Sequence, residues 1–574
     1  MDQKHDIVDS ASITKTESVE NIEDAEDMMM NITKRLAADF KVLKHLIERP
    51  LLKRQTTPSF IYEHQIEAIK SLDIHLDQHF NEITDSKDSK LDDVVVLAAS
   101  FVLMCQVKFL RNSILQQEDL HVAEFLLMRS IILLKDKELN SKSILTSIQA
   151  YHELGFIYSK LKDIKKSLRY LNKTFELYLA YTKGQDEFPA PISIETILNI
   201  QVKSDAVCVL DNVCMASLSI LLRLNNYEHG SIDMEKVVIY MHKLLKKVLI
   251  IFKPFSINYT EWTFEAIQLA EYFLSCRRFI ECKNHLCAAS IMMIKCYEEM
   301  YMAFNEEMCE KDKDIVHRRF KIIVSIIDMI WVKYGLVILS LSRKRLLQKE
   351  EENNLCEINK SKTESITQPN KKFTELLMFT ATEEKFRKFT YTMPDDYITN
   401  YADAKMLFVQ ILQLLNNLKV KEFASVSLEF GTQIAHYTSK AYKYLAFYEN
   451  DKIKQIKLQK RRIDVLEDYL KTTCTNDNFI NCTFLWFELA VVYSTLINIK
   501  LKNLELSELT AEDSVEINSL VKNSVHYFQL YVNICEHTNP QGNKDNQIMS
   551  CFNLTYNKTT MYADLYEKYL QDMG

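Results

Sequence analysis

The chain has 574 residues, of which only 7 are glycine and 8 are proline, well below the average usage of roughly 7% and 5%. Strand-and-turn folds and nucleotide-binding folds need glycine, so this composition predicts an almost wholly helical chain. The net charge of −7 lacks the basic footprint of a general nucleic-acid-binding protein, and we expect no nucleic-acid partner.

The cysteines and the N-terminal residues indicate the cellular compartment in which the protein is found. Thirteen cysteines are scattered along apolar helix faces without a CxxC pair, which suits reduced thiols better than a disulfide framework. Residues 1–30 are acidic and polar, without the pattern of a secretory or mitochondrial signal. We therefore expect a cytoplasmic protein.

The first part of the chain is expected to hold helices in pairs. Residues 1–20 are polar, and we expect them to be disordered. An amphipathic helix is predicted at 21–48, because apolar residues recur at helical spacing from Met28 to Ile47. Apolar periodicity and turn residues predict further helices at 59–83, 91–111, 118–134, a pair ending near 181, 194–224, 234–252, 260–275, 278–300 and 317–347.

Within that series, residues 151–178 resemble a tetratricopeptide repeat (TPR). The motif positions are held by Tyr151, Leu154, Gly155, Tyr158, Ser167 and Leu171. Gly155 lets the second helix cross close to the first, and Ser167 is small because the neighbouring helix passes there. One such pair cannot bury its apolar face alone, so further pairs must stack beside it.

A charged and polar stretch at 348–372 is predicted to be a flexible loop. It would separate an N-terminal solenoid at 21–347 from a C-terminal one at 373–574. In the second part, Trp486, Leu489, Ala490 and Tyr493 repeat the motif at the same spacing. Further elements are expected as helices at 399–417, 421–447, 451–471, 515–535 and 547–570, with an acidic loop at 504–513. The predicted fold is an all-α, TPR-like right-handed α-solenoid of stacked antiparallel helix pairs.

The apolar run at 322–341 is long enough to cross a bilayer. Asp328 and Lys333 lie near its middle, where each would cost roughly 2.5–3.5 kcal/mol in a membrane. We therefore expect a buried solenoid helix and no membrane insertion.

Motifs of catalysis and cofactor binding are missing from the sequence. No GxGxxG, GxxxxGK[ST] or GxSxG occurs. The nearest approach to HExxH, at His152-Glu153, lacks the second histidine and is already explained by the repeat. We expect no catalytic residue, no metal site and no cofactor, and an enzyme is the third alternative.

Residues 452–462, KIKQIKLQKRR, form the sharpest charge run. The ordinary interpretation is a helix with one solvated basic face. The functional interpretation is a contact for an acidic partner surface, carried by Lys460, Arg461 and Arg462. A calmodulin-target or membrane-surface helix is a weaker alternative.

Three stretches resemble the KIF-binding protein family. The most specific joins KxLAFYE at 443–449 to KRRIxxLE at 460–467. The others are Glu261-Trp262 followed by CKNHLCAAS at 282–290, and the repeat at 151–178. Weaker agreement covers most of the chain from about residue 21. The family usually has further helices beyond the region that matches Met561 to Tyr569, so its last pair is expected to be missing here.

The resemblance implies a non-enzymatic TPR-like α-solenoid that binds kinesin motor domains and competes with the microtubule for them. It also implies a cytoskeleton-associated protein with roles in microtubule organisation, axon growth and mitochondrial transport. The alternative is a TPR scaffold for another complex, such as a chaperone tail or a signalling assembly. A chaperone-tail clamp would need a Lys, Arg and Asn cluster on inward faces, which the expected positions lack.

In a TPR, the first helix of each pair faces inward and can hold a partner helix. The residues expected to line that surface are Gln149, His152, Phe156, Ser159, Asp211, Asn212, Glu265, Gln268 and Glu271. For each of them the ordinary alternative is a solvated or packing residue.

Overall fold

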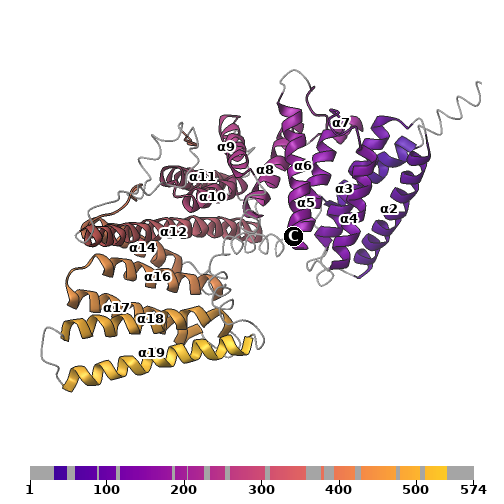
Figure 1. Cartoon of the computed structure of the whole chain (residues 1–574). Helices are drawn as coiled ribbons and strands as arrows, with labels where there is room; N and C mark the ends of the chain where they lie inside the picture. Colours follow the sequence, from indigo (N-terminus) through magenta and orange to yellow (C-terminus); the bar gives the residue numbers. More distant parts are fainter. Residues whose placement is uncertain are drawn as a thin grey trace, which may run out of the picture. The chain divides into compact units, whose positions relative to one another are not determined.

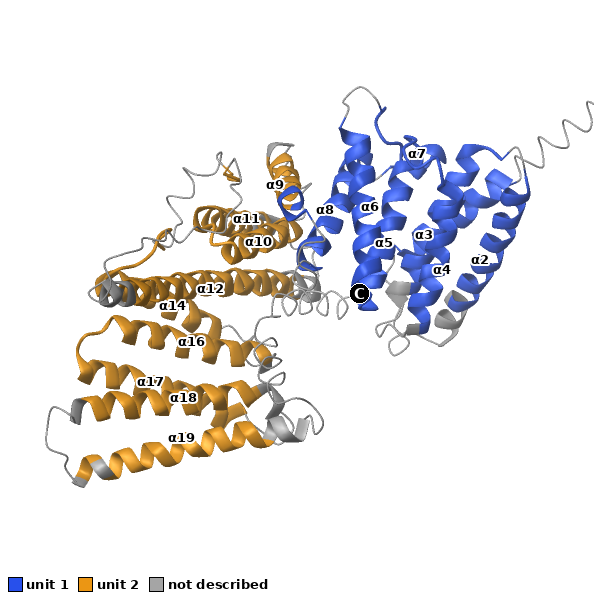
Figure 2. Cartoon of the chain, viewed as in Figure 1, with its two compact units in different colours: residues 1–237, 560–574 blue, residues 238–559 orange. Residues whose placement is uncertain are grey.

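The computed structural model describes residues 32–47, 59–86, 89–111, 117–183, 188–202, 204–224, 233–251, 259–303, 310–356, 376–379, 393–420, 428–473, 479–504 and 511–538. Every regular element in these residues is a helix (Figure 1). The chain divides into two compact units (Figure 2). Unit 1 contains residues 1–237 and 560–574, and unit 2 contains residues 238–559.

Unit 1 is a stack of helices that are neighbours in the chain. A helix at 32–47 is followed by α2 (Ser59–Asp85), α3 (Leu91–Arg111), α4 (Gln117–Leu134), α5 (Ile144–Lys160), α6 (Ile164–Thr182), α7 (Ile194–Ile197) and α8 (Ala206–Leu224). The pairs α3/α4 and α5/α6 are joined by contacts between α4 and α5. One apolar cluster extends from Leu36 to Ile194, so the core grows by stacking.

Unit 2 repeats the arrangement of unit 1. After α9 (Met234–Ile251), which crosses the unit boundary, its helices are α10 (Tyr259–Ser275), α11 (Phe279–Ala303), α12 (Glu310–Cys356), α14 (Tyr401–Val420), α16 (Leu428–Tyr448), α17 (Lys452–Thr473), α18 (Phe479–Leu504) and α19 (Ala511–Thr538). The pairs are α10/α11, α12/α14, α16/α17 and α18/α19. The prediction of an all-α solenoid of stacked antiparallel pairs is confirmed.

The repeat motif packs as its spacing predicts. A Cβ atom on Gly155 would lie 2.5 Å from Leu171 Cγ, so only glycine permits this crossing of α5 and α6 without a shift. Ser167, buried at the same crossing, donates a hydrogen bond to the Gly155 carbonyl at 2.7 Å. Tyr158 is buried and stacks on Tyr170. The small residues of the motif therefore permit the close helix crossing, and its large residues fill the space between the helices, as the motif predicts.

The prediction of one helix over 194–224 is wrong. The structure has the short α7, a connection and then α8. Asn199 takes a left-handed conformation with φ 52° and ends α7, while Asp205 accepts a hydrogen bond from the Val207 N–H at the start of α8. Asn and Asp favour such turns because their side chains bond nearby backbone groups.

Two loop boundaries also differ from expectation. Helix α12 continues to Cys356 instead of ending near 347, because the Lys, Gln and Glu residues beyond 347 are strong helix formers. Helix α19 begins at Ala511, within the expected acidic loop, where Glu512 and Asp513 suit a helix N-terminus. The division of the chain at 348–372 stays a prediction. The expectations for 1–31, 357–372 and 547–570 fall outside the described residues.

The apolar run at 322–341 lies within α12. By length and composition, three helical segments in the described chain could cross a membrane, at Ala206–Leu224, His317–Lys349 and Cys482–Lys502. In the second, 78% of the most apolar window of 18 residues is buried inside the protein. Helix α12 contacts α10, α11, α14 and α16, and its Lys333 pairs with Glu271 of α10 at 2.6 Å. These contacts make α12 a core helix of unit 2.

Candidate functional site

The expected site residues of unit 1 lie on two helices that pack together, α5 and α8. Helix α5 carries Gln149, His152, Phe156 and Ser159, and α8 carries Asp211 and Asn212. Gln149 and Phe156 are half-buried, and Asn212 is exposed. The structure therefore brings these six residues onto adjacent helices.

Three of these residues already have partners within unit 1. His152 Nδ1 lies 2.8 Å from Ser217 Oγ, and burial lowers the pKa of His152, which favours the neutral ring. Asp211 accepts a hydrogen bond from the Tyr178 hydroxyl at 2.9 Å. The Ser159 hydroxyl donates to the Phe156 carbonyl at 2.6 Å. A partner would compete with these contacts, except at exposed Asn212.

In unit 2, the first helices of successive pairs contact one another: α10 with α12, α12 with α16 and α16 with α18. We call these four the inner helices. Of the expected residues on α10, Glu265 is half-buried and Gln268 is buried. Glu271 pairs with Lys333 of α12. Burial alone would lower the pKa of Lys333, but the Glu271 carboxylate raises it. Glu271 therefore links two helices.

Helix α17 carries the basic run, and the structure separates its residues. Its first turns expose Lys452, Lys454, Lys457, Lys460 and Arg461. Lys460 pairs with Glu516 of α19 at 3.1 Å. These side chains form a positive face, which suits an acidic partner.

Arg462, by contrast, is only 1% exposed and belongs to the core. Its guanidinium pairs with Glu488 of α18 and donates to Gln459 Oε1 at 2.7 Å. The expectation that Arg462 would be part of the basic surface is corrected: its position on the apolar stripe of α17 directs it inward.

Around this pair the structure reveals a group that the sequence analysis missed. We call Arg343, Lys440, Lys443, Arg462 and Glu488 the Glu488 cluster. Burial would raise the pKa of Glu488, but Arg462, Lys443 and Lys440 lower it. Burial lowers the pKa of both lysines, which are half-buried on α16.

The Glu488 cluster holds more positive than negative charge. Three cations, Arg462, Lys443 and Lys440, act on the Glu488 carboxylate, and a fourth, Arg343, lies near enough to affect Lys443 and Arg462. A carboxylate supplied by a partner would offset this surplus. The i, i+3 spacing of Lys440 and Lys443 on one helix face could have indicated the group from sequence.

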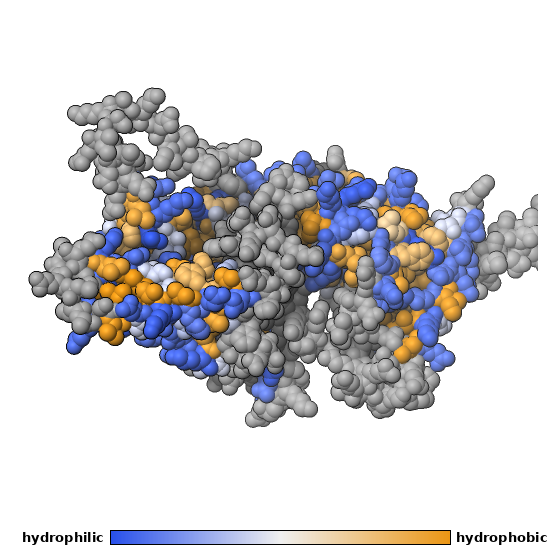
Figure 3. Space-filling view, turned by 60° about the horizontal axis from the view of Figure 1, so that its bottom comes forward, coloured by the Kyte–Doolittle hydropathy of each residue, from blue (hydrophilic) through white to orange (hydrophobic). Residues whose placement is uncertain are grey.

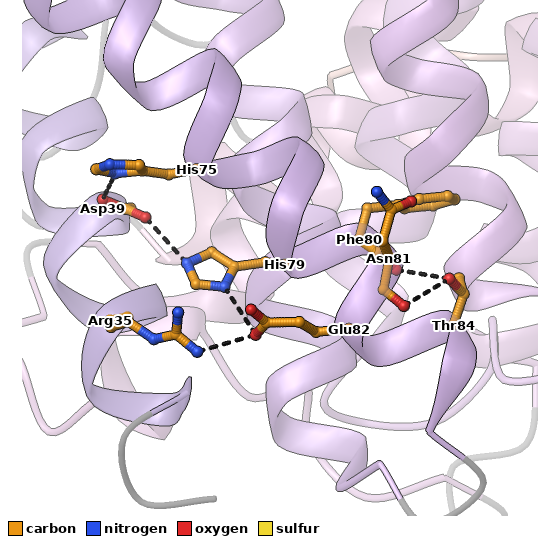
Figure 4. Close-up of polar contacts among 8 residues, drawn as sticks. All are labelled: Arg35, Asp39, His75, His79, Phe80, Asn81, Glu82 and Thr84. Atoms are coloured by element: carbon orange, nitrogen blue, oxygen red, sulfur yellow. Dashed lines mark hydrogen bonds and ion pairs between the residues drawn. The ribbon is translucent and has the colours of Figure 1, made fainter. Parts of the chain in front are cut away.

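A second polar group lies in unit 1 (Figure 4). Asp39 binds the ring nitrogens of His75 and His79, each at 3.3 Å, and Arg35 pairs with Glu82 at 2.9 Å. Among the described residues, no group of three or more His, Cys, Asp or Glu is arranged to hold a metal ion. The ion pairs join Arg35 and Asp39 of the helix at 32–47 to His75, His79 and Glu82 of α2, and so tie the two helices together.

Exposed apolar side chains also occur. Figure 3 shows hydrophobic patches among hydrophilic atoms on the face it presents. On α19, four valines are exposed, at Val515, Val521, Val525 and Val532. Val521, Val525 and Val532 share one face of α19 by their spacing, and exposed apolar residues are also ordinary on protein surfaces.

The fold and these surfaces define a helical-repeat protein whose charged inner faces suit contacts with another protein. The family model described as KIF-1 binding protein C terminal matches residues 260–570. The chain belongs to the KIF-binding protein family.

Several curated proteins are similar to most of the chain. The KIF-binding protein of Gallus gallus is 25% identical over 433 residues, covering 72% of this chain and 69% of the relative. That of Drosophila melanogaster is 22% identical, covering 88% and 82%. That of Homo sapiens is 23% identical, covering 72% and 66%. A solved circular tandem repeat protein aligns with 88% of this chain and 98% of its own at 12% identity, but its TM-score of 0.21 is too low to support a fold argument.

Proposed function

We propose that this protein binds kinesin motor domains and, by occupying them, blocks their attachment to microtubules. Its membership of the KIF-binding protein family supports the proposal, since every similar protein described above from an animal carries that name. The action would be non-enzymatic, because a partner held on helix faces needs no reacting group.

The observation that carries this proposal is the continuous row of inner helices with charged side chains along it. We infer that a helix of the motor lies along this row, with its acidic side chains toward Lys440 and Lys443 of the Glu488 cluster. The half-buried lysines favour such a contact, since a partner carboxylate would offset their unbalanced charge. Glu265, on the inner helix α10, would contact polar groups of the motor.

The cellular consequences belong to the same proposal. A protein that detaches motors from microtubules would act in the cytoplasm on the cytoskeleton. It would affect microtubule organisation, axon growth and mitochondrial transport. The family resemblance supports these roles.

Co-sedimentation tests the proposal. A panel of kinesin motor domains is pelleted with microtubules, with and without the full chain. We expect at least one motor to leave the pellet and to appear in a soluble complex. The Lys440→Glu/Lys443→Glu variant should weaken that complex by about tenfold or more, because it reverses two charges at the interface.

The matched control is Lys471→Glu, on the last turn of α17, where the side chain is 68% exposed. This variant should release the motors as wild type does, and circular dichroism should show that both variants remain helical. If every motor pellets unchanged and no complex forms, the kinesin proposal fails for that panel. If the two variants behave alike, the Glu488 cluster is not the contact.

A further inference from the structure

Four residues between α12 and α14 lie in a pocket of unit 2. Residues 376–379, Leu-Leu-Met-Phe, belong to no helix and lie against side chains of α9, α10 and α11. Phe379 is 2% exposed and Leu377 is also buried, whereas Leu376 is 58% exposed. The stretch thus buries every second side chain, Leu377 and Phe379, against the helices, as an extended peptide does on a binding surface.

Aromatic rings from three helices surround Phe379. Its ring centroid lies 4.7 Å from that of His242 on α9, 4.7 Å from that of His285 on α11 and 5.5 Å from that of Trp262 on α10. The Trp262 indole is fixed by a hydrogen bond from Nε1 to the Leu245 carbonyl at 3.1 Å. The pocket is therefore lined by aromatic rings on three helices and holds one further ring, that of Phe379.

Polar groups of the pocket bind the backbone of the stretch. Asn284 Oδ1 accepts the Phe379 N–H at 2.9 Å in a buried position. His242 hydrogen-bonds the backbone of Met378, and its Nδ1 lies 3.1 Å from His285 Nε2. His285 Nδ1 in turn lies 2.9 Å from the Glu281 carbonyl oxygen. A side-chain amide and an imidazole that bind main-chain groups are typical of peptide recognition.

We propose that α9, α10 and α11 form a docking site for extended peptides with an aromatic anchor, and that residues 376–379 occupy it in cis. The ligand class is an extended segment with a leucine two residues before a phenylalanine. A partner that carries such a segment would compete for the site. The inference is independent of the kinesin proposal, because it uses none of the same contacts.

Competition is feasible because the internal ligand is short. Only two of its side chains are buried, and their burial must offset the conformational entropy lost by four ordered residues. Tethering raises the local concentration of the internal ligand, so a free peptide should bind the wild-type chain weakly. Removing the anchor ring should open the site.

The test uses full-length chains and a fluorescently labelled peptide with the sequence of residues 374–381, followed by anisotropy. We expect the peptide to bind the Phe379→Ala variant at least about tenfold more tightly than wild type, because the internal competitor is gone. A peptide with alanine in place of the phenylalanine should bind neither chain. In a Phe379→Ala/Asn284→Ala background, affinity should fall again, because the backbone contact is removed.

Leu376→Ala is the matched control, since that side chain is exposed, and this variant should behave as wild type. Circular dichroism checks folding, and Phe379→Leu replaces Phe379→Ala if the latter does not fold. Failure of the peptide to bind a folded anchor variant would overturn the proposal. Equal binding to wild type and variant would overturn it too, because the peptide would then be binding elsewhere.

Discussion

At the scale of single residues, Gly155 shows how closely sequence and packing agree. The motif predicted a position without a side chain, and the structure places Leu171 where a Cβ would be. The motif also predicted a small residue at 167. It could not predict that the Ser167 hydroxyl would bond the Gly155 carbonyl, because that contact depends on how α6 is placed over α5.

Gly155→Ala should destabilise unit 1 by about 1–3 kcal/mol, because the added methyl group overlaps Leu171. Urea unfolding followed by far-UV circular dichroism measures the effect. In a Leu171→Ala background the overlapping atoms are gone, and Gly155→Ala should lower the free energy of unfolding much less. Equal costs in both backgrounds would show that the crossing tolerates a side chain.

Arg462 is the residue at which sequence reasoning and structure diverge most. Replacing it with alanine should destabilise unit 2 by about 3 kcal/mol, because Glu488 would lose its direct ion pair and keep only the cations Lys440 and Lys443 near it. Lys460→Ala breaks only an exposed pair and should cost less than about 1 kcal/mol. Denaturant titration compares the two. If both variants lose a similarly small free energy of unfolding, a structural role for Arg462 is contradicted.

The two caged histidines predict a pH dependence. Burial lowers the pKa of His242 to about 4 and of His285 to about 3, below the ordinary value of 6.5. Lys246 near His242, and His242 and Arg278 near His285, act in the same direction. Between about pH 6.5 and pH 4 the unfolded chain binds more protons than the folded one. The stabilisation is thus complete above pH 6.5 and is lost as the pH falls, by an amount on the order of 3 kcal/mol for each histidine at pH 4.

Unfolding midpoints measured across that window check the expectation. A His242→Gln/His285→Gln variant should show a flatter dependence on pH. His121→Gln, at an exposed position on α4, should keep the wild-type slope. A wild-type slope in the double variant would assign the effect to other groups.

At the scale of elements, the spacing of apolar residues in α17 predicts which of its side chains are buried, and it already marks Arg462 as one of them. Its buried residues Gln459, Arg462, Ile463, Leu466 and Leu470 follow helical spacing. That stripe, read from the sequence alone, places Arg462 with the apolar residues. The break between α7 and α8 was harder to predict, because apolar residues continue on both sides of it and only the turn chemistry of Asn199 and Asp205 marks it.

The exposed cations of α17 occupy the wrong end of the helix for stability. Positive charges near a helix N-terminus oppose its dipole, and Asp451, which accepts the Ile453 and Lys454 N–H groups, offsets this only in part. Lys452→Glu/Lys457→Glu should therefore raise the unfolding free energy by about 0.3–1 kcal/mol, mainly through Lys452, because of the two only Lys452 lies in the first turn. We expect the same variant to bind kinesin motors less well in the co-sedimentation assay.

A variant that is more stable but binds motors less well would show that the exposed cations of α17 serve partner recognition. Charge-neutral changes at the same positions, to glutamine, provide the control and should give intermediate results in both assays. If the glutamate variant is less stable than wild type, the dipole explanation is wrong.

At the scale of the whole molecule, composition was enough to predict the fold class. The scarcity of glycine and proline predicted helices, and two copies of one motif predicted stacked pairs. The boundary between the two units, near residue 237, was not predicted, because it falls inside the periodic pattern of α9. Interactions between residues far apart in sequence, such as the electrostatic interaction of Lys440 with Glu488, could not be predicted from periodicity either.

The apolar helix α12 gives a prediction for the intact chain. Because its apolar window is largely buried and Lys333 is paired with Glu271, the folded protein should not insert into lipid. In a flotation assay with neutral phosphatidylcholine vesicles, we expect the full chain to stay in the soluble fraction. Lys333→Ala, which leaves Glu271 unpaired inside the protein, should still not float while it remains folded. Flotation of the folded wild type would refute the prediction.

The division into units has a consequence for spectroscopy. All three tryptophans of the chain, Trp262, Trp331 and Trp486, lie in unit 2. Intrinsic tryptophan fluorescence therefore reports on one half of the protein only, whereas far-UV ellipticity records the helices of both. If the units unfold independently and differ in stability, the two signals will give transitions that do not coincide, and the gap between them will measure the difference in stability between unit 1 and unit 2.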